Sequence, residues 1–561
     1  MTRQLKLSIL VMAIGLFLCI LDTTVMNIAL PTIQSGLHTS LSSLQWALNI
    51  YTITFAALTI PLGRLADNYG RNKIYLIGLG LFFIGSLASG SATNILMLIV
   101  GRCVQSIAAA IVFPASMTIG ISLVHSNQRQ TVILILGLTQ GLAAAFGPVV
   151  GGILTQYAGW RSIFFINTPL LVIAIGLSFV LLPFKNEKRV KSLLDVPGLI
   201  LIILTLFSLT LALVQAGTLG WINAETDALL CVFSLSLALF IRREMLANDP
   251  IIDLSLFKDR QFSGSVIVTV LAGIFFVALM VLMPSYFTKI QGASELQAAL
   301  LVTPASFMVF MLSPIGGLLL KTVSPRLLIG FGLGLTSLAY IGLSLITPTI
   351  YWQFMLCCLL LGSGYGLIIG PVTVLSASDF TGQQLSSSQS VLGVFRQIGT
   401  VLAVAIFVSS LSGNLQTAKQ ALYQDAQTNV KKLRVTPHEQ EAILTTTHRA
   451  IFQRQYSRPA TTALSTAKCK QLAIKTAKRY AVNHRLGLAK KTVLLRVESA
   501  TFHHLTHFNL ALKQYQNSLQ QSEKQHMTAA FLAPYKNALL FTILAIATIF
   551  VFKRKKYISI D

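Results

Sequence analysis

An acid and a base interrupt two apolar stretches that are otherwise long enough to cross a membrane. Asp22 lies within the run 8–28, and Arg102 lies within the run 95–119. An ionisable side chain inside a bilayer is costly, so it is expected to be paired or neutral for part of the time and to serve a function. Burial favours the neutral form of a carboxyl group, whereas water favours the charged form. Asp22 is therefore a candidate proton carrier, and the alternative is a purely structural buried pair.

A second acid stands among cations in the segment 63–73, which follows the second apolar run. Asp67 precedes Arg71 by four residues, and Gly63 and Gly70 would permit a tight turn between packed helices. The simplest interpretation is a turn stabilised by its own charge pairs.

A counterpart of this segment occurs in the second half of the chain, at 317–326. Lys321 stands there where the first copy has its acid. Ser324 followed by Pro325 is typical of a helix start, so the next span should begin there. We expect Asp67 to face that helix N-terminus, where the helix dipole favours an anion.

The apolar run 131–155 is rich in small residues. Small residues let helices approach closely, and a proline removes a backbone hydrogen bond and bends its helix. The sequence pattern is formed by Gly147, Pro148, Gly151 and Gly152. A packing helix with a kink is the plain alternative, although it would need only some of these residues.

Two further polar residues lie within apolar runs. Gln105 follows Arg102 by about one helical turn, and Arg396 is the only other charge well inside a span. Arg396 is expected either to line a cavity of the second half or to pair with backbone carbonyls. Four phenylalanines would suit an apolar cavity but equally well simple packing: Phe275, Phe276, Phe307 and Phe310.

The composition defines the elements that must position these residues. Of the 561 residues, 54% are hydrophobic and only 11% are charged, against about 25% charged in soluble proteins. This excludes an ordinary soluble enzyme. A spanning helix needs about 20 mostly apolar residues, and fourteen runs qualify: 8–28, 44–62, 74–92, 95–119, 131–155, 163–183, 196–215, 227–241, 265–287, 297–320, 326–346, 352–375, 388–411 and 537–552.

The basic residues predict the orientation of these spans. With both termini in the cytoplasm, the inner segments hold twenty Lys and Arg residues, and the short outer loops hold only Arg161 and Lys289. Cytoplasmic loops of membrane proteins carry such an excess, so much of the net charge of +25 reflects topology and not nucleic-acid binding. We expect a multi-pass protein of the cytoplasmic (inner) membrane.

One long segment, 413–535, falls outside on this topology. It carries 18 Lys and Arg residues, 5 acids and seven of the nine histidines. Long loops translocate largely regardless of charge, so the assignment stands. The default expectation is a partly helical hairpin or small extramembrane domain, and contact with anionic lipid or a partner protein is the alternative.

These motifs together resemble the major facilitator superfamily, and within it the fourteen-span drug:proton antiporters of the EmrB/QacA type. The segment Gly63–Arg71 resembles the signature loop, in which the carboxylate locks the two halves in one access state. Gly147-Pro148-x-x-Gly151-Gly152 resembles the antiporter motif of drug exporters. Leu21-Asp22-x-Thr24-x-x-Asn27-x-Ala29-Leu30-Pro31 resembles the first helix of these antiporters, and Arg102 matches their buried arginine. The resemblance covers about 8–411 and 532–552.

The resemblance implies an all-α integral membrane protein with the major facilitator fold and alternating access. The expected parts are a first six-helix bundle (1–190), two inserted helices (191–245), five helices of the second bundle (246–412), the basic outer segment (413–535), and the last helix with a basic cytoplasmic tail (536–561). It further implies proton-coupled export of hydrophobic or amphiphilic compounds, with Asp22 and Arg102 in proton coupling and the proton gradient as the energy source. Gln105 and Arg396 are candidate cavity residues.

The expected partners are a small-molecule substrate, protons and the lipid bilayer, with no nucleic acid, no metal ion and no cofactor. A periplasmic adaptor protein is a further candidate if the organism has an outer membrane. One rival is a transporter of the same fold for a metabolite, siderophore or lipid. A second rival is a membrane-embedded enzyme that uses 413–535, although the acids and histidines there form no recognisable catalytic pairing.

Overall fold

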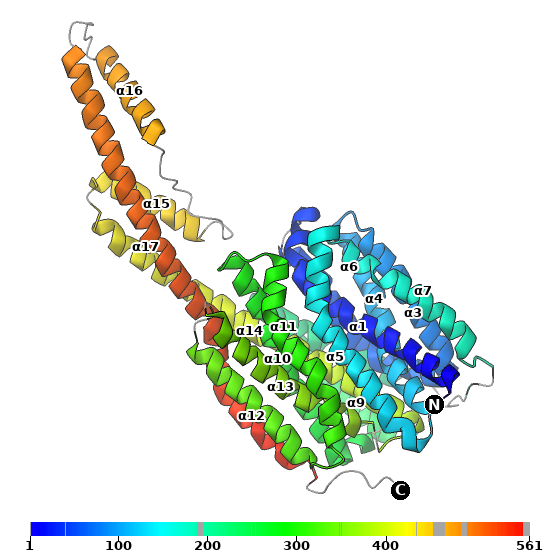
Figure 1. Cartoon of the computed structure of the whole chain (residues 1–561). Helices are drawn as coiled ribbons and strands as arrows, with labels where there is room; N and C mark the ends of the chain where they lie inside the picture. Colours follow the sequence, from blue (N-terminus) through cyan, green and yellow to red (C-terminus); the bar gives the residue numbers. More distant parts are fainter. Residues whose placement is uncertain are drawn as a thin grey trace. The chain divides into compact units, whose positions relative to one another are not determined.

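The computed structural model describes residues 2–39, 41–185, 187, 195–247, 250–252, 254–346, 348, 350–377, 379–433, 435–452, 466–483 and 491–553. All regular elements in these ranges are helices (Figure 1). They provide fourteen segments long and apolar enough to cross a bilayer. The predicted all-α class and the number of spans are therefore confirmed. Part of the expected basic tail (554–561), and the inner cations Lys188, Arg189 and Lys191, lie outside the described residues.

The chain forms two compact units. The first comprises Met1–Ser410 and Pro534–Asp561, and the second comprises Leu411–Ala533. Two long helices, α14 (Gly382–Lys431) and α17 (Lys491–Ala545), contribute residues to both units.

The first half of the first unit contains six spans, the last of which is built from two consecutive helices. Its helices are α1 (Arg3–Gly36), α2 (Leu41–Tyr69), α3 (Arg71–Gly90), α4 (Ile95–Ser122), α5 (Ser126–Ala158), α6 (Ser162–Phe165) and α7 (Asn167–Leu181). Local sequence sets several of these ends. The side chain of Asn94, for example, accepts a hydrogen bond from the Met97 N–H at 2.9 Å and caps α4.

The second half follows an inserted helical hairpin. The hairpin consists of α8 (Val196–Leu219) and α9 (Ala224–Leu246). After the short helix η1 (Leu254–Lys258) come α10 (Arg260–Lys289), α11 (Glu295–Leu319), α12 (Pro325–Leu345), α13 (Tyr351–Leu375), the start of α14, the end of α17 and η3 (Ile546–Val551). A capping box formed by Ser294 and Gln297 begins α11.

The inserted hairpin packs on both halves. Helix α8 lies against α2 of the first half. It also forms an apolar cluster with α14 of the second half, centred on Leu213, Val401 and Ala405, and the Ser409 hydroxyl donates to the carbonyl oxygen of Ala216 at 3.1 Å. Helix α8 therefore lies along the seam between the two halves.

The second unit is a helical bundle of its own. It contains the end of α14, α15 (Pro437–Phe452), α16 (Thr466–Asn483) and most of α17. Buried contacts inside it include a hydrogen bond of 3.0 Å between the hydroxyls of Thr447 and Tyr515. The partly helical character expected of this segment agrees with the structure.

Candidate functional site

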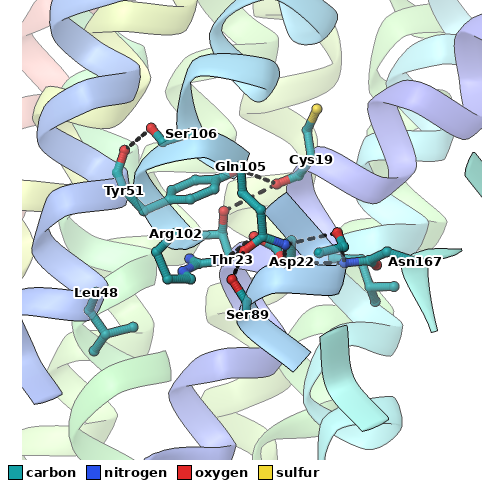
Figure 2. Close-up of polar contacts among 12 residues, drawn as sticks. Cys19, Asp22, Thr23, Leu48, Tyr51, Ser89, Arg102, Gln105, Ser106 and Asn167 are labelled. Carbon is teal, nitrogen blue, oxygen red and sulfur yellow. Dashed lines mark hydrogen bonds and ion pairs between the residues drawn. The ribbon is translucent and has the colours of Figure 1, made fainter. Parts of the chain in front are cut away.

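Asp22 and Arg102 form a buried ion pair in the interior of the first half (Figure 2). Asp22 lies near the middle of α1, and Arg102 lies in the second turn of α4. Their relative exposures are only 3% and 1%. Arg102 Nη1 donates to Asp22 Oδ2. A buried charge is stable only with an opposite charge and further hydrogen bonds. Asp22 and Arg102 each provide the opposite charge that the other needs.

A network of four polar side chains from α3, α4 and α7 surrounds the second oxygen of Asp22. Gln105 Nε2 donates to Asp22 Oδ1 at 3.1 Å, and Asn167 Nδ2 donates to the same atom at 3.3 Å. Ser86 accepts from Gln105 at 3.0 Å and from Asn167 at 3.4 Å, while Ser89 donates to Gln105 Oε1 at 3.1 Å. All four side chains are fully buried. Such a network fixes the carboxylate in one position until its charge changes.

Aromatic rings complete the surroundings of Arg102. The guanidinium carbon lies 4.2 Å from the centre of the Tyr51 ring and 6.0 Å from that of Phe164. The Tyr51 hydroxyl donates to the Cys19 carbonyl oxygen at 3.3 Å. Within the described part of the chain, Arg102 Nε has no hydrogen-bond partner. Arg102 Nη1 also donates to Gln105 Oε1 at 3.1 Å. The cation is thus held by one carboxylate, one amide and ring faces, and loss of the carboxylate charge would leave it largely unpaired.

The glycines of α5 bring that helix directly against α1. A Cβ atom at Gly147 would overlap the Thr24 hydroxyl and lie 2.6 Å from the Thr24 Cβ. A Cβ atom at Gly151 would lie 3.1 Å from the Val25 carbonyl oxygen. Thr24 and Val25 follow Asp22 by two and three residues. The contact between the two helices therefore lies within one turn of the buried acid.

The same helix also contacts the second half of the molecule. A Cβ atom at Gly152 would lie 3.0 Å from the Cα of Leu296, and one at Gly141 would lie 3.4 Å from the Cα of Phe310. Both partners belong to α11, which lies beside α5 (Figure 1). Pro148 stands inside the helix between these contacts. Glycines thus line two sides of α5, one toward Asp22 and one toward the other half.

The acid of the predicted turn is tied to the second half by Arg71. Arg71 Nε donates to Asp67 Oδ1 at 2.6 Å, and Arg71 Nη2 donates to the Gly382 carbonyl oxygen at 2.9 Å. Asp67 is only 3% exposed. A Cβ atom at Gly63 would lie 2.6 Å from Ser390 Oγ, so α2 and α14 are in close contact here.

Gly70 provides the sharp change of direction between α2 and α3. Its φ of 113° is a backbone conformation that favours glycine. A side chain there would also overlap the carboxylate of Glu187, which accepts a hydrogen bond from the Asn72 N–H at the start of α3. The turn is therefore held by a residue from the far end of the first half.

The helix that faces Asp67 is not the predicted one. Among the residues that the structure describes, Asp67 accepts a hydrogen bond from Ser386 near the start of α14 and none from the start of α12. Helix α12 does begin at Pro325, as expected, but the Ser324 side chain makes no capping hydrogen bond. The expectation failed because hydropathy places a helix start along the chain without showing which helices lie opposite one another.

Arg396 lies at a separate contact between the halves. Its Nη1 donates to Gln140 Oε1 of α5, and its guanidinium carbon lies 5.5 Å from the centre of the Phe113 ring of α4. Tyr365 of α13 also interacts with it electrostatically. Within the described residues no carboxylate pairs with Arg396. Arg396 therefore connects α14 to the first half, and it does not belong to the Asp22 network.

The four phenylalanines do not gather at one place. Phe275 packs edge-on against Tyr340 with ring centres 5.5 Å apart, and Phe276 stacks on Tyr365 at 4.4 Å. Phe307 is 51% exposed. Phe276 is close to the surroundings of Arg396 through Tyr365, and the backbone of Phe310 lies beside Gly141, the residue after Gln140.

Several polar residues of the interior were missing from the sequence-based predictions. Asn167, Ser86 and Ser89 belong to the Asp22 network. Gln140 accepts a hydrogen bond from Arg396. Each is a polar residue inside an apolar run, which is the signal that singled out Asp22. Amides and hydroxyls are common in membrane helices, however, so that signal is weak without a charge.

These arrangements define a class of protein. Two halves built from membrane-spanning helices meet through charged and polar side chains in their interior and at their ends, as expected of a membrane transporter with alternating access. The family model of the Major Facilitator Superfamily matches residues 12–404, and the chain belongs to this family. It is accordingly a transporter and not an enzyme.

Curated relatives are similar over most of the chain. The multidrug resistance protein Stp of Mycobacterium tuberculosis is 28% identical over 414 residues, which cover 73% of this chain and 77% of that protein. The methylenomycin A resistance protein of Bacillus subtilis is 30% identical over 419 residues, covering 72% and 87%. The riboflavin transporter RibZ of Clostridioides difficile is 28% identical over 417 residues, covering 74% and 90%.

Proposed function

We propose that this protein exports hydrophobic or amphiphilic compounds in exchange for protons, with Asp22 as the proton carrier. The observation that carries the proposal is the buried Asp22–Arg102 pair, whose helix contacts α5 within one turn of the acid. The names of two relatives, a multidrug resistance protein and a methylenomycin A resistance protein, support export of toxic compounds. The excess of inner cations supports the cytoplasmic membrane as the location, with both termini in the cytoplasm.

The proposed coupling begins with a proton that enters from outside and neutralises Asp22. The neutral acid attracts Arg102 less strongly, and removing one charge of a buried pair costs about 3–5 kcal/mol. Protonation therefore destabilises the present arrangement of α1 and α4. Because Thr24 and Val25 pack on the glycines of α5, a shift of α1 is passed to α5 and on to α11.

The cycle is completed on the cytoplasmic side. The substrate leaves outward while Asp22 holds its proton, and the proton is released to the cytoplasm when the pair with Arg102 forms again. The Asp67–Arg71–Gly382 contact would hold the halves together at the cytoplasmic end during the outward-facing part of the cycle. The proton gradient would supply the energy, and an adaptor protein would be a further partner if an outer membrane is present.

Proton flux driven by substrate tests the proposal. An exported compound is first selected from a toxic panel by the resistance it gives a susceptible host. The purified protein is then placed in proteoliposomes containing a pH-sensitive dye. Asp22→Asn should abolish proton flux driven by the compound, whereas Asp227→Asn, which removes an exposed acid of α9, should leave it unchanged.

A double variant separates coupling from structure. Asp22→Asn with Arg102→Gln removes both charges and should recover much of the stability lost in either single variant. Proton flux should nevertheless stay absent. Equal flux in wild type and Asp22→Asn, or full flux in the double variant, would end the proposal for Asp22.

A metabolite transporter is a second candidate because one similar protein, RibZ, is named a riboflavin transporter. The two candidate functions predict different effects of expression on the growth of the cell. Expression should raise resistance to members of the toxic panel if the protein exports such compounds. If it instead only restores growth on limiting riboflavin or another nutrient, the metabolite function is favoured.

A further inference from the structure

Helix α16, in the second unit, carries only positive charge on its exposed side. The stretch Thr466–Asn483 contains no acidic residue. Four of its cations are exposed to solvent: Lys470, Lys475, Lys478 and Arg479. At 100° per residue these four positions occupy one side of the helix.

The opposite side of α16 is buried within the unit. Cys469, Ala473 and Ala477 follow one another at four-residue intervals and are at most 4% exposed. Asn509 of α17 donates to the Cys469 sulfur at 3.3 Å, and α16 runs beside α17 (Figure 1). The small buried side chains fix the rotation of α16, so the four cations, hereafter the α16 basic face, are held outward together.

Two acids of the second unit pair with histidines and not with the cations of α16. Asp425 pairs with His526 at 2.9 Å, and Glu439 lies 3.6 Å from His504. In the described part of the unit, both of these acids pair with histidines, and no lysine or arginine of α16 takes part in an ion pair. The four cations of the α16 basic face therefore form no ion pair with an acid in the described part of the unit.

We propose that the α16 basic face binds an anionic membrane surface. Three of its four cations are lysines, which act as mobile point charges and suit a fluid array of lipid phosphates. Protein interfaces instead are depleted in lysine and depend on aromatic or arginine anchors in packed pockets. The α16 basic face offers no aromatic residue, so an acidic protein fits it less well.

Exposed leucines accompany the cations. Leu472 of α16 is 41% exposed, and Leu495 near the start of α17 is 56% exposed, next to the exposed Arg496. Basic amphipathic helices bind membranes by placing cations at the headgroups and apolar side chains at the acyl boundary. The combination of cations and isolated leucines in this part of the unit matches that mode of membrane binding. The proposal does not depend on the direction of transport.

Vesicle flotation with the full-length protein tests the proposal. The protein is placed in nanodiscs of phosphatidylcholine, so that its membrane spans are occupied, and mixed with vesicles of phosphatidylcholine alone or vesicles rich in phosphatidylglycerol. Wild type should float with the anionic vesicles only. Changing the four cations of the α16 basic face to Gln should weaken binding by about a thousandfold, given the usual contribution of each basic residue near an anionic surface.

A matched control removes the same charge elsewhere in the unit. Lys431→Gln, Lys432→Gln, Lys513→Gln and Lys524→Gln together take away four exposed cations that do not share one face. This control should keep most of the binding, and circular dichroism should show both variants to be folded. Equal loss in both variants, no preference for anionic vesicles, or stronger binding of soluble polyglutamate than of vesicles would overturn the proposal, the last in favour of an acidic protein.

Discussion

The Thr32 hydroxyl lies 2.7 and 2.8 Å from the two carboxylate oxygens of Glu295, and this contact joins α1 to α11. It lies at the end of the helices opposite the Asp67 turn, because α1 ends and α11 begins there. Together with Arg71–Gly382 and Arg396–Gln140, it means that the halves are bridged at both ends and between them. In this structure the two halves are therefore joined by polar contacts at both ends of their helices.

Thr32→Val should weaken the contact at the Glu295 end. The variant keeps the shape of the side chain but removes the donor, which costs about 1 kcal/mol for a bond to a charged group that is partly exposed. Spin labels at the exposed positions Ser35 and Leu300 should report a larger mean separation than in wild type. Thr139→Val removes a hydroxyl that bonds only within its own helix and should leave that separation unchanged.

Gly147→Ala should impair transport by forcing α5 away from α1. The added methyl group would overlap the Thr24 hydroxyl, and overpacking of this kind costs about 1–3 kcal/mol. Transport of the selected compound should fall several-fold at equal membrane abundance, and Thr24→Ala should restore part of it. Gly176→Ala, at a position with open space around it, is the matched control. Unchanged transport in Gly147→Ala would show that the close contact is dispensable.

Arg71→Lys should separate charge from geometry at the turn between α2 and α3. Lysine keeps the charge beside Asp67 but cannot reach two acceptors with a rigid fork, so the bond to the Gly382 carbonyl should be lost. We expect reduced transport with normal expression, and the same for Asp67→Asn. Lys73→Gln removes an exposed cation of the same segment and should retain activity. Full activity of Asp67→Asn would show that the turn does not control the cycle.

The hydrogen bonds between Asp195 and Arg243 should make a contribution to folding stability that is lost in acid. It caps α8, and hydrogen bonds from Arg243 of α9 hold the pKa of the Asp195 carboxyl below its ordinary value of about 3.9. A depressed pKa stabilises the folded state above the ordinary value, and this stabilisation is lost as the pH falls through the lower folded value. Asp195→Asn should therefore lower the Tm slightly at neutral pH, and the difference from wild type should vanish in acid. A difference that grew on acidification would contradict this assignment.

The spans and the buried charges could be predicted because each rests on information local to the chain. A run of about 20 apolar residues has few alternatives to a membrane helix, so every expected run from 8–28 to 537–552 coincides with a described helix. Asp22 was conspicuous for the same reason, since a carboxylate inside such a run must be compensated. The roles given to Asp22, Arg102 and the α5 glycines stay predictions until transport is measured.

The contacts between helices could not be read from the chain in the same way. Besides Arg71, Asp67 contacts Ser386 of α14, more than three hundred residues later, and the partner of Glu295 is Thr32. Neither pair has a spacing that marks it, because hydropathy specifies which face of a helix is apolar without specifying its neighbour. Asn167 was overlooked because a single amide does not stand out among the hydroxyls of nearby spans.

The two glycine-lined sides of α5 have a consequence for how such a protein can change. Any side chain added at Gly147, Gly151 or Gly152 would meet another helix at short range. Populations selected for resistance to a new compound should therefore accumulate substitutions in other helices while these positions stay glycine. In deep mutational scanning, substitutions at these three positions of α5 should be lost from the population whichever compound is used for selection.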